Sequence, residues 1–227
     1  MSLEERARRE RALQHAAARA SACRACAIGA QRRNNVYGEG DPLADLMLVG
    51  EGPGDTEDRL GRPFVGRAGE LLEKMLAAIA LAREDVYIAN TVKCRPTSQG
   101  ERGLKNRAPD PAEMANCRPF LDEQIEIIRP RVLLALGAPA AKSFLGASYA
   151  ITKQRGRWER GPLDIPLLVT FHPAYVLRQT GGELTAVKRL VWDDLKAVRT
   201  RIDALAAKNE AAAARQVGLF EADPVVE

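Results

Sequence analysis

The chain of 227 residues is poor in histidine and aromatic residues: it has two histidines, His15 and His172, and aromatics make up 5% of it. It has no run of eighteen apolar residues, so the sequence predicts no membrane-spanning helix. Charged residues occur throughout Met1–Ala20, which is unlike a secretory signal peptide. We therefore expect a cytoplasmic protein in which few imidazoles are available for chemistry.

Charge is nearly balanced, with 34 lysines and arginines against 30 aspartates and glutamates and a net charge of +4. This small basic excess permits a polyanionic partner without requiring one. A chain of this length suits one α/β domain of ordinary size. We expect a single domain over residues 1–206 and a flexible, alanine-rich tail over residues 207–227. Nothing in the sequence requires a second subunit, so we expect a monomer.

Four short apolar runs lack a helical period, as expected of strands buried on both faces of a parallel sheet. They are Leu46–Val49, Val86–Ala89, Val132–Leu136 and Pro166–Thr170. Helical caps or helical apolar spacing mark five further segments. These are Ser2–Ala20, Ala68–Ala82, Asp110–Ile128, 138–145 and Glu183–Ala206. The alternation predicts an α/β fold, with Ile151–Arg160 as a β-ribbon or a bent edge strand.

Polar side chains follow three of the four predicted strands: Glu51, Asn90 and His172. The carboxyl ends of parallel strands meet at one edge of a sheet, so we expect these side chains to converge on one crevice. An amide at that edge can both donate and accept, which suits recognition of a nucleobase. The ordinary alternatives are an asparagine that closes a loop and a structural histidine beside a proline.

The segment after the first strand is rich in glycine and ends with one aromatic ring. Gly52 and Gly54 leave backbone N–H groups unobstructed, and Phe64 stands between Gly61 and Gly66. A ring presented from such a loop can stack on a base. The alternatives are a phosphate-binding turn and a simple tight connection, because glycine-rich turns are common.

The four cysteines are Cys23, Cys26, Cys94 and Cys117. The Cys23–Cys26 spacing lets two sulfurs reach one metal centre, and the other two complete a set of four. In a cytoplasmic chain this favours a metal site over disulfides, the alternative being unrelated thiols. The segment Lys93–Arg107 has five basic residues against one acidic residue. It is either a phosphate contact, which we assign to Arg107, or a solvated insertion.

Five ordered blocks give the chain a resemblance to a known family. They are GEGPGDTED at 50–58, GRPFVGRAGELL at 61–72, YIANTVKCRP at 87–96, NRAPDPAE at 106–113 and FHPAYVLR at 171–178. Together with the cysteines, they resemble the family 4 uracil-DNA glycosylases, the iron-sulfur branch of the uracil-DNA glycosylase superfamily. The resemblance implies a three-layer sandwich with a central four-stranded parallel sheet flanked by helices. It also implies a nucleoid-associated DNA repair enzyme that hydrolyses the N-glycosidic bond of uracil and leaves an abasic site.

The resemblance implies that Cys23, Cys26, Cys94 and Cys117 hold a 4Fe-4S cluster with a role in folding, zinc being the second choice. Phe64 would stack on the flipped uracil, Asn90 would bond its N3–H and O4, and His172 would donate to O2 and stabilise the departing anion. The Gly52 N–H would also bond the base.

Other roles follow less directly from the resemblance. Glu51 would position water or balance the sugar cation, because Gly52 takes the place of an aspartate found in the best-known branch of the superfamily. Gly54 replaces the aromatic residue that excludes thymine there, so Glu57 is expected to supply that steric barrier. Val176, Leu177 and Arg178 resemble a loop that wedges into the duplex.

Two departures and two alternatives accompany the resemblance. The family usually has alanine at Gly52, and the interval Cys94–Cys117 is longer than expected, although it lacks the histidine of a related branch that bonds covalently to the abasic sugar. The alternatives are a uracil- or abasic-DNA binding protein with weak or no turnover and, more distantly, an electron-transfer protein.

The segment Gln216–Phe220 resembles the pentapeptide with which bacterial repair proteins dock on the sliding clamp. Leu219 and Phe220 would fill an apolar pocket, and Gln216 would bond nearby backbone. A chance pair of apolar residues in a solvated tail is the alternative. Deleting residues 216–220 should abolish capture by the clamp in a pull-down, and unchanged capture would contradict the motif.

Overall fold

The computed structural model describes residues 2–101 and 103–220, with side chains through residue 208. Within this range, the main sheet has six strands in the order β1-β3-β2-β6-β8-β7. A separate hairpin joins β4 to β5. The strands are β1 (Glu39–Gly40), β2 (Leu46–Gly50), β3 (Tyr87–Asn90), β4 (Thr97–Gly100), β5 (Gly103–Asn106), β6 (Val132–Leu136), β7 (Trp158–Arg160) and β8 (Pro166–Thr170).

The four predicted strands form the centre of the sheet and are parallel, in the order β3-β2-β6-β8. Short antiparallel strands, β1 and β7, complete the two edges. The predicted parallel sheet is therefore confirmed, and the edge strands extend it to six. With two or three residues each, the edge strands are too short to show an alternating pattern.

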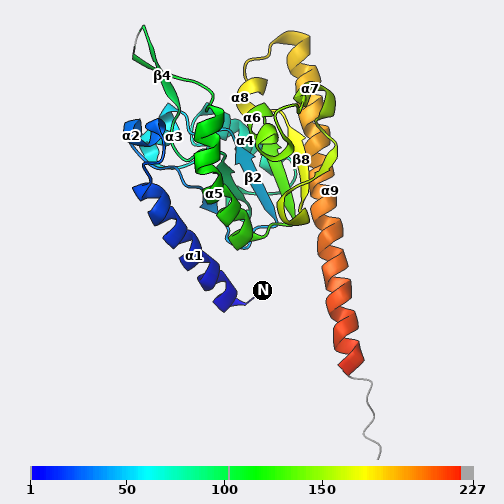
Figure 1. Ribbon diagram of the computed structural model, residues 1–227. Helices are drawn as coiled ribbons and strands as arrows, with labels where there is room; N and C mark the ends of the chain where they lie inside the picture. The colour runs from blue at the N-terminus through cyan, green and yellow to red at the C-terminus, as the bar shows by residue number, and fades with distance from the viewer. Residues whose placement is uncertain (1, 102, 221–227) are drawn as a thin grey trace, which may run out of the picture.

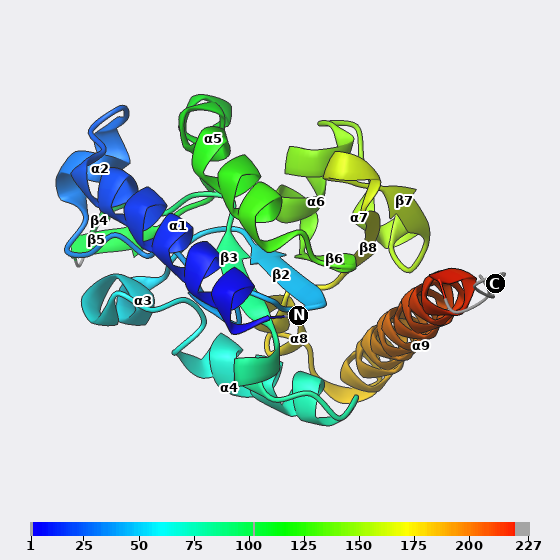
Figure 2. The ribbon, with the colours of Figure 1, turned by 90° about the horizontal axis from the view of Figure 1, so that it is seen from below.

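Helices cover both faces of the sheet and make three layers (Figure 2). One face carries α4 (Arg67–Ala77), α8 (Pro173–Val176) and α9 (Gly181–Phe220), which share a buried apolar cluster with the sheet. The other face carries α5 (Pro111–Ile128) and α6 (Ala138–Leu145), with α1 (Leu3–Ala22) packed on α5. Shorter elements are α2 (Ala27–Gln31), α3 (Asp55–Leu60), α7 (Ile151–Gln154), η1 (Arg83–Asp85) and η2 (Pro162–Asp164).

Capping explains where the best-predicted helices begin. Ser2 caps α1 by accepting from the Glu5 N–H at 3.2 Å. At α5, the Asp110 side chain accepts from the Glu113 N–H at 2.8 Å, and the Glu113 carboxylate accepts from the Asp110 N–H at 2.9 Å. Such reciprocal pairs satisfy amides that the helix cannot bond internally.

Three segments differ from the prediction. Residues Ile151–Arg160 divide into the helix α7 and the edge strand β7. The helix α4 ends at Ala77 rather than at residue 82. The closing helix α9 continues past Ala206 to Phe220, as alanine favours, so residues 207–220 are helical. The side chains of Gln216, Leu219 and Phe220 lie outside the described part, as do residues 221–227 in full.

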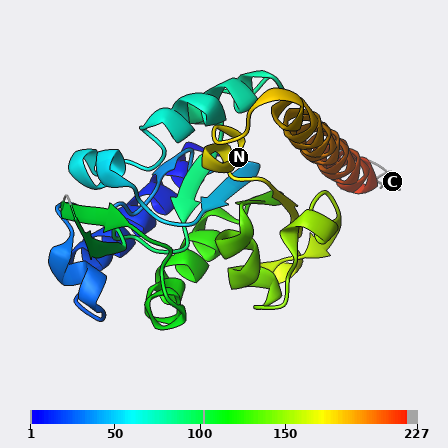
Figure 3. The ribbon, with the colours of Figure 1, turned by 90° about the horizontal axis from the view of Figure 1, so that it is seen from above.

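The carboxyl ends of the parallel strands lie at the upper end of the molecule in Figure 1, where α3, α6 and α8 begin. The β4–β5 hairpin projects from the same end, and Figure 3 looks down on it. The three polar residues predicted to converge therefore follow strands at one edge. Among the described helices, none combines the length and apolar character needed to cross a membrane.

Candidate active site

A cleft of about 790 Å³ opens at the carboxyl ends of the parallel strands. It gathers side chains from α3, from the loop before α4, from β3 and from the loop between β8 and α8. The predicted site residues that line it are Glu51, Gly52, Gly54, Glu57, Phe64, Asn90, Arg107, His172 and Arg178. Residues far apart in the sequence are thus brought to one place.

His172 is the N-cap of α8, and this position fixes its tautomer. Its Nδ1 accepts a hydrogen bond from the Ala174 N–H at 3.0 Å, so in the neutral ring the proton resides on Nε2. Burial lowers the pKa of His172 to about 4, the Arg178 charge lowers it too, and the Glu57 charge opposes the shift. At neutral pH His172 is therefore an uncharged imidazole with one N–H left to donate.

Asn90 ends β3 and is 2% exposed. Its Oδ1 is buried and has no hydrogen-bond partner within the described part of the chain. A Cβ at Gly50 would lie 2.5 Å from this oxygen, so glycine is required beside it. A buried acceptor without a partner costs free energy, about 1–3 kcal/mol, unless a donor is supplied. The amide is thus arranged to receive a donor.

Phe64 is held in a left-handed conformation, with φ of 51°. This conformation costs a non-glycine residue about 1–2 kcal/mol. Its ring stacks on His172 with centroids 5.5 Å apart and planes 25° apart, and it is 5% exposed. The two predicted base-contacting rings therefore lie side by side in the cleft.

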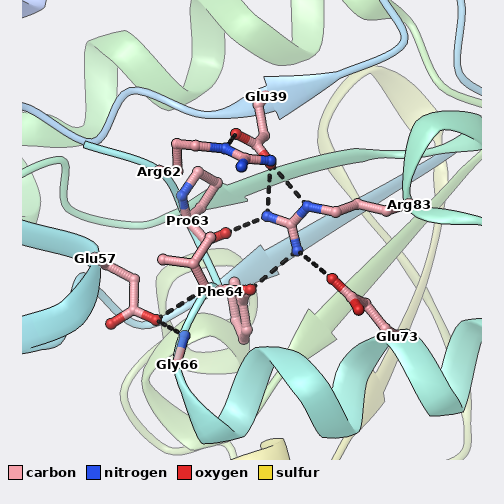
Figure 4. A network of polar contacts seen from close by, with 9 residues as sticks. Glu39, Glu57, Arg62, Pro63, Phe64, Gly66, Glu73 and Arg83 are labelled. Atoms are coloured by element: carbon pink, nitrogen blue, oxygen red, sulfur yellow. Dashed lines mark hydrogen bonds and ion pairs between the residues drawn. The ribbon is translucent and has the colours of Figure 1, made fainter. Parts of the chain in front are cut away.

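Glu57 binds the loop that carries Phe64. Its carboxylate accepts from the N–H groups of Gly54 at 3.1 Å, Val65 at 3.0 Å and Gly66 at 2.9 Å. Figure 4 shows Glu57 directed at Gly66 beneath Phe64. Its main visible role is to fix the loop, which the sequence did not indicate, and the steric barrier predicted for it remains a prediction.

Glu51 follows β2 and lines the cleft partly buried. Burial raises the pKa of its carboxyl group, and the charge of Arg178 counteracts this effect. Gly52 lies beside it, where an added Cβ would come within 2.8 Å of a Val92 methyl carbon. The alanine usual in the family would therefore require a shift of Val92, so the change at Gly52 is matched to its packing.

The predicted DNA contacts divide into exposed and buried residues. Leu177 is 42% exposed and Arg178 is also exposed. Val176 is 3% exposed and belongs to the apolar core, because the single turn of α8 packs against α4 and α9. A side chain buried there cannot touch DNA, so the contact assigned to Val176 is not supported and Val176 anchors α8 instead.

Arg107 lines the cleft, and four hydrogen bonds hold its guanidinium within the protein. It pairs with both Glu113 oxygens at 2.7 and 2.5 Å and bonds the Thr97 and Ala108 carbonyls, each at 3.0 Å. It therefore fastens the β4–β5 hairpin to α5, and the phosphate contact assigned to it remains a prediction. Asn106, on the same hairpin, lines the cleft without having been predicted, because its place depends on a hairpin register that the sequence does not reveal.

The four cysteines line one small cavity away from the cleft, with Ile28 and Phe120 among its apolar walls. The Arg32 Nη1 lies 3.0 Å from Cys94 Sγ, and the Lys93 N–H donates to Cys117 Sγ at 3.2 Å. Burial raises the pKa of both thiols. Within the described residues, no three or more His, Cys, Asp or Glu side chains are placed to hold a single metal ion. The cavity has apolar walls and four thiols, and N–H groups lie at two of the sulfurs. These features nevertheless suit a metal group bound by thiolates.

We predict that His172 remains a neutral Nε2–H imidazole as the pH falls until about 4. Because its pKa is lower than the ordinary 6.5, protons favour the unfolded chain, and its contribution to stability falls as pH drops from 6.5 toward 4. Imidazole ¹⁵N NMR measures this directly, and His15→Gln isolates the signal. Titration near 6.5, or a proton on Nδ1, would contradict the assignment.

Comparison with known proteins agrees with this geometry. Residues 37–196 match the family model described as the uracil DNA glycosylase superfamily. A type-4 uracil-DNA glycosylase of Thermotoga maritima is 45% identical over 86% of this chain and 96% of its own length. One from Sulfurisphaera tokodaii is 40% identical over 78% of this chain and 79% of its own length. A type-5 uracil-DNA glycosylase of Pyrobaculum aerophilum is 36% identical over 63% of this chain and 66% of its own length. The chain belongs to the uracil-DNA glycosylase superfamily and, within it, to the type-4 branch.

Proposed function

We propose that this protein removes uracil from DNA by hydrolysing the bond between the base and its sugar, leaving an abasic site. The observation that carries the proposal is the pairing of a buried, unpartnered Asn90 Oδ1 with a neutral His172 that has one free N–H. Uracil presents a donor at N3 beside an acceptor at O2, which matches these two groups.

The base must leave the helical stack to reach the cleft. Stacking on Phe64 would hold the flipped ring, and the Gly52 N–H would add a backbone donor. Leu177 and Arg178, both exposed just after α8, would contact the duplex that the base has left.

Bond cleavage places negative charge on the departing uracil, mainly at its carbonyl oxygens. The Nε2–H of His172 would donate to O2 and stabilise this charge in a partly dehydrated cleft. A neutral donor suits this step because it strengthens its hydrogen bond as the charge grows without having to surrender its proton. Glu51, a carboxylate at the end of β2, would orient water toward the sugar or balance its developing positive charge.

Asn90 would distinguish uracil from cytosine. Its Oδ1 would accept from the uracil N3–H, and its NH₂ would donate to O4. Cytosine has an acceptor at N3 and a donor at C4. Its N3 would face the Asn90 Oδ1 and its amino group would face the Asn90 NH₂, so neither pair could form a hydrogen bond.

We predict that Asn90→Asp lowers the rate of uracil release by about 100-fold and introduces slow cytosine release, because the carboxylate loses the donor for O4. Single-turnover assays with uracil- and cytosine-containing oligonucleotides measure both rates. Asn106→Asp is the matched control, as it changes another amide in the same cleft. If Asn90→Asp and Asn106→Asp release uracil at the same rate as each other, and likewise cytosine, the role of Asn90 is contradicted.

We also propose that Cys23, Cys26, Cys94 and Cys117 hold a 4Fe-4S cluster. Four thiols in one apolar cavity, with N–H donors to two sulfurs, support this choice. When bound, the cluster would supply a covalent cross-link between α1, α5 and the segment after β3, with no part in the hydrolysis.

The purified chain should be brown and contain about four iron and four sulfide per chain. Cys117→Ser should lose iron and melt at a lower temperature, because metal binding is coupled to folding. Asn116→Ala, a change in the same cavity that spares the thiols, should keep its iron. About one zinc per chain in place of iron would favour the zinc alternative.

We also propose where the enzyme acts and which partner it binds. A DNA substrate would place it in the cytoplasm at the nucleoid, acting as a monomer. The sliding-clamp motif at residues 216–220 would recruit it to replicating DNA. Its sequence supports this interaction, and its side chains are outside the described residues.

A further inference from the structure

Two oppositely charged side chains grip the backbone on either side of Phe64 (Figure 4). Glu57 accepts from the N–H groups of Val65 and Gly66, at 3.0 and 2.9 Å. On the other side, Arg83 donates to the carbonyls of Pro63 and of Phe64, the latter at 3.0 Å. One backbone group of each of four consecutive residues is thus bonded to a side chain from another element.

Arg83 reaches this loop from η1, outside the cleft, and does not line it. Its side chain is 14% exposed. Its Nε bonds Glu39 on β1 at 2.7 Å, and Glu73 on α4 lies 3.7 Å from Nη1. Arg83 is therefore held from the sheet edge and from α4 while its guanidinium grips the two carbonyls.

The hydrogen bonds from Arg83 hold Phe64 in a strained backbone conformation. Phe64 has φ of 51°, a conformation that a phenylalanine leaves readily unless its surroundings enforce it. Both carbonyls that Arg83 binds flank the Phe64 Cα, so their directions depend on the torsions that are strained. Releasing them would let the ring rotate away from His172, on which it now stacks at 5.5 Å.

We infer that Arg83 is a positioning residue for uracil excision: it fixes the strained backbone of Phe64, so that the ring is already in place when the base arrives. The inference rests on the proposed function, because it gives Phe64 a base to stack on. Arg83 touches neither base nor sugar and acts only through Phe64.

The test compares single-turnover uracil release by the wild type, Arg83→Ala, Phe64→Ala and the double variant. Arg83→Ala should be slower by about 10- to 100-fold, as expected when a reacting group is misplaced by about 1 Å. Its affinity for duplex DNA with an abasic site should change less than about twofold, because that ligand has no base. In the Phe64→Ala background, removing Arg83 should change the rate less than about twofold.

Controls separate positioning from folding. Arg62→Ala removes the other guanidinium bound to Glu39, at 2.7 and 2.9 Å, but leaves both loop carbonyls bonded, so it should retain the wild-type rate. Arg83→Lys keeps the charge without the planar fork and should lose part of the rate, which gives a second variant if Arg83→Ala melts early. Melting temperature and iron content are followed for every variant.

The outcomes distinguish the two claims. The role of Arg83 is overturned if the rate losses of the two single variants multiply in the double variant. It is also overturned if Arg83→Ala releases uracil at the wild-type rate. In both cases uracil release itself stands. An iron-loaded wild-type protein that releases no uracil would overturn the proposed function, and the role of Arg83 with it.

Discussion

The hydrogen bond from the Ala174 N–H to His172 Nδ1 determines what the cleft can do. It assigns the imidazole proton to Nε2, and burial keeps the ring neutral by lowering its pKa to about 4. A charged imidazole would attract any anion, whereas a neutral N–H offers one directed bond. The bond exists because His172 caps α8, which is separated from β8 by two residues, so the order of the elements decides which imidazole nitrogen carries the proton.

A second physical link runs from the cysteine cavity to the base pocket through Lys93. Its side chain is fully buried, where burial lowers its pKa to about 8, and its Nζ donates to the Asn90 carbonyl at 2.8 Å and to Gln124. Its backbone N–H donates to Cys117 Sγ. The strand end that carries Asn90 is thus fastened to the segment that carries the thiols.

The sequence predicted the parts of the site that depend on topology alone. Glu51, Asn90 and His172 follow apolar strands, and parallel strands must end at one edge, so their convergence could be foreseen. What could not be foreseen depends on which groups each side chain contacts in the folded chain. Arg107 looked free in a basic segment, yet its guanidinium pairs with both carboxylate oxygens of Glu113. Val176 looked like part of a wedge, yet the one turn of α8 buries it, and Arg83 belongs to no motif, since its partners are backbone carbonyls.

The role of His172 in uracil excision is tested most directly by release of uracil from a labelled oligonucleotide with a single uracil, detected by alkaline cleavage. Wild-type protein and His172→Ala, both loaded with iron, are compared side by side. We expect cleavage at uracil by the wild type and a rate lower by about 100- to 1000-fold in His172→Ala, with DNA binding retained. An iron-loaded wild type that binds uracil-containing DNA but releases no base would contradict this expectation.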